Sequence, residues 1–268
     1  MNYWSGLLLG VALGFYVLGV LVSISVLVSR RQDRVFLIPA VTLAGFIVHF
    51  AGIVLRGVEE GGVPVDNLGG VLLLLAWAAI SIYLLAHFRF RMEVIGIVIL
   101  PLVSALMAIS MLLPSNIGQS RMPLPAGLEM AVRVIHIVPA ILGVSLLFLT
   151  FTASLLYLLQ ERALKAHRPL TFFLKLPSLE RCEKLAHQSL TWGFAMLTFV
   201  VVTGVVTASY GPDDDWRWVL REKWSILAWL IFAVVVYDRT FSGGWRGRKA
   251  AYLSILGFGV IILRMIGA

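Results

Sequence analysis

Eight long apolar runs follow one another along this chain, and they constrain its fold more than any other feature. Each is long enough for a helix that crosses the roughly 30 Å hydrocarbon core of a bilayer. The runs cover roughly residues 4–29, 35–55, 69–88, 93–113, 131–161, 186–209, 223–240 and 249–267. Only 13% of the residues are charged, against about a quarter in a soluble domain. Because helices satisfy their own backbone hydrogen bonds in lipid, we expect an all-α, polytopic integral membrane protein. It should have eight transmembrane helices in a single membrane domain over residues 1–268.

The basic residues are concentrated in every second loop. Fifteen of the 22 lysines and arginines fall in segments 29–34, 87–91, 161–184 and 238–249. Because basic residues collect in cytoplasmic loops, these segments are predicted to be cytoplasmic. Both termini and the Trp-rich loop 209–224 are then expected on the outer side of the cell inner (plasma) membrane. The same bias explains the net charge of +8, so the lipid bilayer is an expected partner and nucleic acid is not.

The sequence has few groups for self-contained catalysis. It contains no Walker, HExxH or GxSxG motif. Its one cysteine, Cys182, excludes an internal disulfide and a CxxC redox pair. No acidic residue lies well inside an apolar run, which weighs against an ion-coupled transporter. A small-solute transporter therefore stays only as a minor alternative.

Two histidines, His49 and His136, lie inside apolar runs. From the predicted orientation, His49 is about 9 Å and His136 about 8 Å below the outer boundary, at 1.5 Å per residue. Neutral imidazole is a ligand of haem iron, and an ionisable group within a membrane often has a function. Alternatively, each histidine forms a hydrogen bond to a neighbouring helix. The similar depth does not show that the two helices are neighbours.

Four tryptophans are crowded into residues 216–229, more densely than an interfacial belt requires. If this stretch is helical, positions 218, 222, 225 and 229 share one face, and 217, 221, 224 and 228 share another. If 215–219 is extended, Trp216 and Trp218 point the same way and form an aromatic shelf for a planar ligand such as a porphyrin. Three nearby cations are candidates for contacts with its propionates: Arg217, Arg221 and Lys223.

The stretch "WRWVLREKWSILAW" (216–229) resembles the Trp-rich WWD region of the cytochrome c assembly family, the haem-handling membrane proteins of the CcsA, CcmC and HemX types. The residues on matching positions are Trp216, Trp218, Glu222, Trp224 and Trp229. Four further stretches are similar to family motifs and follow in the same order. They are "GVPVDNLGGVLLLLAW" (62–77), "VIHIVPAILGVSLLFLTFTASLLYLLQERALK" (134–165), "LPSLERCEKLAHQSLTWGFAMLTFVVVTG" (176–204) and "GGWRGRKAAYLSILGF" (243–258).

In this family the external Trp-rich loop is understood to hold haem, flanked by external histidines. The resemblance implies that role for Trp216, Trp218 and Trp224, and axial ligation of the iron of haem b for His136. It implies a haem-delivery component rather than a self-contained enzyme. Such a component would present haem to the CxxCH thiols of an apocytochrome c, together with a thiol assembly partner subunit in the membrane.

The sequence also departs from the family pattern. Val219 and Leu220 replace an Asp-Pro pair, Tyr237 replaces a histidine, and two glycines at 69–70 replace an acidic residue. No second external histidine follows the final apolar run. Two interpretations remain. In one, His49 supplies the second axial ligand of the haem iron. In the other, a divergent member has lost haem delivery and acts as a membrane scaffold or regulatory protein.

Overall fold

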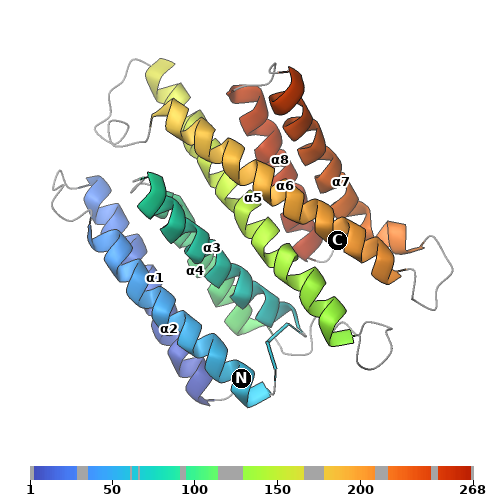
Figure 1. Cartoon of the computed structure of the whole chain (residues 1–268). Coiled ribbons are helices and arrows are strands. Elements are labelled where there is room, and N and C mark those ends of the chain that lie inside the picture. Colours follow the sequence, from blue (N-terminus) through green and yellow to red (C-terminus); the bar gives the residue numbers. More distant parts are fainter. Residues whose placement is uncertain are drawn as a thin grey trace. The chain divides into compact units, whose positions relative to one another are not determined.

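A computed structural model describes residues 3–28, 36–60, 62–65, 67–90, 95–113, 129–165, 178–208, 217–242 and 247–266. They form eight α-helices (Figure 1): α1 (Tyr3–Val28), α2 (Leu37–Glu60), α3 (Leu68–Phe90), α4 (Ile95–Leu112), α5 (Glu129–Lys165), α6 (Leu179–Ala208), α7 (Arg217–Tyr237) and α8 (Arg248–Ile266). A π-helical turn, η3 (Asp238–Ser242), continues α7. No strand occurs in these ranges, so the predicted all-helical fold is confirmed for them.

Seven of these helices, α1 to α7, are long and apolar enough to cross a membrane. The helix α8 is not among the seven; it has 19 residues and carries three cations, Arg248, Lys249 and Arg264. In the described part of the chain, the predicted multi-pass membrane character is therefore confirmed for seven candidate spans. The eighth predicted run is confirmed as a helix.

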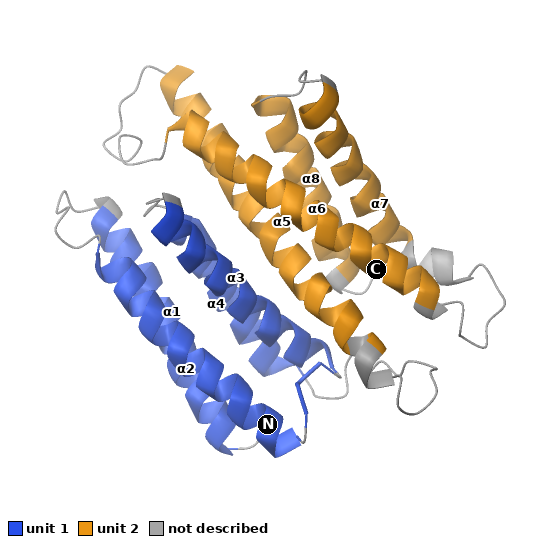
Figure 2. Ribbon diagram, viewed as in Figure 1, with its two compact units in different colours: residues 1–120, 174–177 blue, residues 121–173, 178–268 orange. Residues whose placement is uncertain are grey.

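The chain divides into two compact units, which Figure 2 shows in different colours. Unit 1 consists of residues 1–120 and 174–177, and unit 2 of residues 121–173 and 178–268. In unit 1, α1 packs against α2 and α4, while α3 packs against α4 and α2. In unit 2, α6 packs against α5 and α7, and α8 packs against the same two helices. Each unit is thus a closed four-helix arrangement, and in unit 2 α5 and α7 lie diagonally opposite.

Candidate functional site

The Trp-rich stretch is fixed to the rest of unit 2 by its last tryptophan. The indole Nε1 of Trp229 in α7 donates a hydrogen bond to Thr198 Oγ1 in α6, at 3.0 Å. The ring of Trp229 also stacks on Phe194 of α6, with ring centroids 5.8 Å apart. A buried aromatic ring with a satisfied polar end is a strong packing element. Trp229 therefore holds α7 against α6, which is a structural role.

This contact sets the register between two neighbouring helices. Helices α6 and α7 follow one another along the chain and run in opposite directions (Figure 1). Five residues beyond Thr198 lies Thr203, and five residues before Trp229 lies Trp224. Both steps advance about 7.5 Å toward the same end, at 1.5 Å per residue. Thr203 and Trp224 therefore lie at about the same level, at the end of unit 2 that carries the Trp-rich stretch.

Thr203 contacts the histidine that the sequence singled out. His136 is half-buried in α5, and its Nδ1 lies 2.8 Å from Thr203 Oγ1. The Thr203 hydroxyl also donates to the backbone carbonyl of Phe199 at 2.9 Å. When the one proton of the Thr203 hydroxyl is directed at Phe199, the bond to His136 uses the proton on Nδ1. This tautomer puts the lone pair of the ring on Nε2, one of the two imidazole nitrogens that can bind a metal.

The predicted stretch 209–224 is only partly described. Helix α7 already begins at Arg217, so the helical alternative holds from that residue on. The extended shelf over 215–219 is wrong for 217–219, because the backbone there is helical. Trp216 lies outside the described residues. The side chains of three predicted site residues are also outside them: Arg217, Trp218 and Arg221.

Trp224 is the predicted haem-contacting tryptophan whose side chain is described. It is half-buried, and Lys223 Nζ lies 5.5 Å from the centre of its ring. Its Nε1 is enclosed and has no hydrogen-bond partner among the described residues. A buried N–H without an acceptor costs about 1–3 kcal/mol. An acceptor from a bound molecule would remove that cost, so Trp224 fits a ligand position.

His49 lies in unit 1, inside the packing between α1 and α2. Its side chain is fully buried, and Nδ1 lies 3.1 Å from the hydroxyl of Tyr16 in α1. The two rings meet edge to face, with centroids 5.8 Å apart. Nε2 of His49 has no hydrogen-bond partner in the described part of the chain. Because His49 and His136 belong to different units, their pairing across a haem stays a prediction.

The glycines at 69–70 have a packing reason. Asn67 Oδ1 accepts a hydrogen bond from the backbone N–H of Gly70 at 2.8 Å, in the first turn of α3. Ser110 Oγ of α4 donates to the Gly69 carbonyl at 2.6 Å. A Cβ atom at Gly70 would overlap the backbone carbonyl of Pro64. This loop is therefore closely packed where the family pattern carries an acidic residue.

Sequence reasoning missed the hydroxyl partners Thr203 and Tyr16, which lie in apolar runs, where a threonine hydroxyl can bond within its own helix as well as to a neighbour. By helix rise, His136 and Trp224 lie at about the same level of unit 2. Among the described residues, no group of three or more His, Cys, Asp or Glu side chains can hold a metal ion. An iron held there would need its other ligands from a porphyrin, which the single imidazole fits.

This chain is similar to known proteins of cytochrome c assembly. The family model described as cytochrome C assembly protein matches residues 65–268. The cytochrome c biogenesis protein CcsA of Synechococcus sp. (strain CC9902) is 29% identical over 239 residues, covering 81% of this chain and 78% of the relative. CcsA of Guillardia theta is 27% identical, covering 79% and 75%. CcsA of Synechococcus sp. (strain CC9605) is 26% identical, covering 95% and 90%. Since the family model matches well over half of its residues, this chain belongs to the cytochrome c assembly protein family.

Proposed function

We propose that this protein binds haem b near the outer face of the membrane and presents it for attachment to apocytochrome c. The observation that carries the proposal is the bond between His136 Nδ1 and Thr203 Oγ1, 2.8 Å long. This bond holds the imidazole ring in one orientation, in which Nε2 would bind the iron at the level of Trp224. Membership of the cytochrome c assembly family supports haem as the ligand.

Each predicted residue has a distinct task in this proposal. His136 is an axial ligand of the iron, and Thr203 orients its ring. Three tryptophans contribute aromatic area to the porphyrin: Trp216, Trp218 and Trp224. Arg217 and Arg221 bind the propionates, because guanidinium pairs well with carboxylate. Bound haem would supply the iron and the vinyl groups to which the thiols of apocytochrome c add. A partner subunit in the membrane would act on those thiols.

The proposed topology places the haem site outside the cytoplasm. All eight helices cross the cell inner (plasma) membrane as one domain, both termini lie outside, and so does the loop 209–224. The excess of lysine and arginine in segments 29–34, 87–91, 161–184 and 238–249 supports this orientation. The end of unit 2 that carries His136 and Trp224 is then the outer end.

His49 is the proposed second axial ligand, and the first experiment tests it together with His136. The visible absorption spectrum is recorded for protein purified from haem-replete cells, beside His136→Ala and His49→Ala. His187→Ala is a matched control, because His187 is exposed and lies near the other end of α6. A Soret band that is lost or shifted in both variants, and unchanged in the control, supports a site with two histidines.

Two other outcomes separate the alternatives. A band changed by His136→Ala alone keeps haem binding and removes His49 from the site. The absence of haem in the wild type, with no uptake of added hemin, refutes the proposal. The scaffold or regulatory function would then take its place. Tyr237, which stands at the position of a family histidine, supports that alternative.

A further inference from the structure

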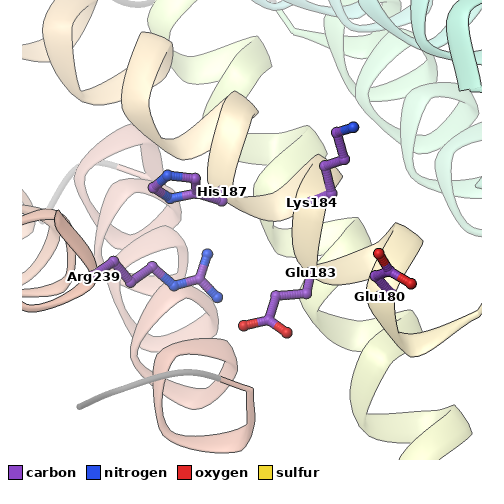
Figure 3. A pocket seen from close by; sticks show the side chains of 5 residues that line it. All are labelled: Glu180, Glu183, Lys184, His187 and Arg239. Carbon is purple, nitrogen blue, oxygen red and sulfur yellow. The ribbon is translucent and has the colours of Figure 1, made fainter. Parts of the chain in front are cut away.

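A polar cavity lies at the opposite end of unit 2 from the Trp-rich stretch. Its volume is about 280 Å³, and Figure 3 shows the five side chains that line it: Glu180, Glu183, Lys184, His187 and Arg239. Glu183 precedes Thr203 by 20 residues in α6, which is about 30 Å at 1.5 Å per residue. The cavity is therefore separate from the proposed haem site. Drug-sized ligands occupy about 300–1,000 Å³, so this cavity suits a smaller polar group.

The wall formed by Glu183 is firmly positioned. Its Oε1 accepts a hydrogen bond from the backbone N–H of Gly247, at 3.2 Å, just before α8 begins. Gly247 has a φ of 69°, and a Cβ atom there would lie 2.5 Å from the hydroxyl of Tyr157 in α5. Only glycine fits both conditions. Glu183 therefore joins α6 to the start of α8, where a negative charge is favourable for the helix dipole.

Arg239 forms the other wall, and its guanidinium is poorly satisfied. It lies in the π-helical turn η3, a rare conformation that often occurs at functional sites. Its Nε and Nη1 are enclosed and have no hydrogen-bond partner among the described residues. Figure 3 shows the guanidinium directed toward the side of Glu183, whose charge acts on it. Arg239 is half-buried, and two enclosed guanidinium nitrogens without a hydrogen-bond partner are costly, so an anionic group is the expected ligand of Arg239.

The charges of the cavity are separated rather than mixed. In Figure 3, Arg239 and His187 lie on one side, and both acids lie on the other together with Lys184, so that side keeps a net negative formal charge. The two acids balance the formal charges of Arg239 and Lys184. A simple anion would meet the carboxylates as well as the guanidinium. A zwitterion can satisfy both sides at once, with its negative group on Arg239 and its positive group on the carboxylates.

The position of the cavity indicates where such a zwitterion comes from. It lies at the beginning of α6 and the end of α7, both of which are candidate membrane spans. Next to Arg239, Tyr237 and Phe241 expose 63% and 76% of their surface, with ring centroids 5.3 Å apart. Exposed aromatic rings at span ends are typical of the membrane interface. Basic pockets between transmembrane helices bind anionic lipid headgroups, and by the same reasoning a pocket that carries both signs of charge suits a headgroup that carries both.

We propose that this cavity binds the headgroup of a zwitterionic phospholipid that carries a primary ammonium, such as phosphatidylethanolamine. The phosphate lies on Arg239, and the ammonium lies between Glu180 and Glu183. The acyl chains run beside Tyr237 and Phe241.

The first test needs no variant. The purified protein in detergent is mixed with phosphatidylethanolamine, phosphatidylglycerol and phosphatidylcholine of equal acyl chains, and bound lipid is counted by native mass spectrometry. We expect phosphatidylethanolamine to bind about tenfold more tightly than the other two, since one charge-assisted hydrogen bond of the ammonium is worth about that factor. Equal binding of all three lipids, or a preference for phosphatidylglycerol, overturns the proposal. Soluble phosphoethanolamine that binds as tightly as the lipid also overturns it, because the source would be a free phosphate ester.

The second test assigns the residues. Arg239→Gln should lower phosphatidylethanolamine binding about tenfold, through loss of a charge-assisted hydrogen bond to the phosphate. Glu180→Gln should reduce the preference over phosphatidylglycerol without disturbing the contact between Glu183 and Gly247. Arg181→Gln is the matched control, an exposed cation beside the cavity that does not line it. If both cavity variants bind lipid as the control does, the cavity is not the site.

Discussion

The bond between His136 and Thr203 offers the sharpest perturbation of the proposed haem site. Thr203→Val keeps the shape of the side chain and removes the hydroxyl that accepts the Nδ1 proton. The tautomer with its proton on Nε2, which cannot bind iron through that nitrogen, then becomes accessible, and the ring loses its fixed orientation. A neutral hydrogen bond contributes about 0.5–1.5 kcal/mol, and 1.4 kcal/mol is a factor of ten. We expect hemin affinity to fall about tenfold, at the low end of the 10–100-fold that such supporting partners typically provide.

The assay is a hemin titration followed at the Soret band, with two companion variants. Thr203→Ser keeps the hydroxyl and should bind hemin nearly as the wild type does. Thr191→Val removes a hydroxyl from the same helix that donates only to its own backbone, at His187, 2.9 Å away. It should leave affinity unchanged, which separates the effect of His136 from a general effect on α6. Wild-type hemin affinity in Thr203→Val would refute the argument that this bond prepares the imidazole.

The remaining predictions concern packing, and thermal unfolding in detergent checks each one. Gly70→Ala should destabilise unit 1 by roughly 1–3 kcal/mol, because its Cβ meets a backbone oxygen that cannot turn away; wild-type stability would contradict this close approach. Trp229→Phe should lower the free energy of unfolding by about 1 kcal/mol, because the indole hydrogen bond is lost. An unchanged melting temperature would show that this bond does not stabilise the fold. Tyr16→Phe should destabilise by about 1–3 kcal/mol, because it leaves both ring nitrogens of His49 without a partner. Adding His49→Phe should recover most of that loss, and additive losses would show that the two rings do not interact.

Hydropathy located the helices well but not their ends. The run predicted to begin at residue 223 is part of a helix that already begins at Arg217. Three of the six intervening residues are charged, so a hydropathy argument excludes the segment, although none of the six is Gly or Pro and all are compatible with a helix. Apolar length measures the part of a helix that lies in lipid, whereas backbone propensity and capping decide where the helix starts. The extended alternative for Trp216 and Trp218 failed at 217–219 for this reason.

The partners of the site residues could not be predicted, because they depend on the register between helices. The sequence singled out His136 and His49 by depth, but nothing in it states that one faces Thr203 and the other Tyr16. The hydroxyl of Thr203 is inconspicuous in an apolar run, since it can bond to a carbonyl of its own helix. Register between α6 and α7 follows from aromatic packing at Trp229, which is visible only once the helices are assembled.

The structure also changes how the departures from the family pattern should be weighed. The glycines at 69–70 follow from close packing against Pro64, so the missing acidic residue there does not by itself indicate a lost function. Trp229 is equally weak as an indicator, because its contacts with α6 stabilise the fold whether or not haem binds. The bond between His136 and Thr203 is more informative when it is removed. It contributes only about 1 kcal/mol to stability, and it is compatible with the tautomer that has its proton on Nδ1 and its lone pair on Nε2. The same bond is also the contact with a neighbouring helix that the sequence allowed for His136. Hemin affinity in Thr203→Val, and not the bond itself, therefore separates haem binding from the scaffold alternative.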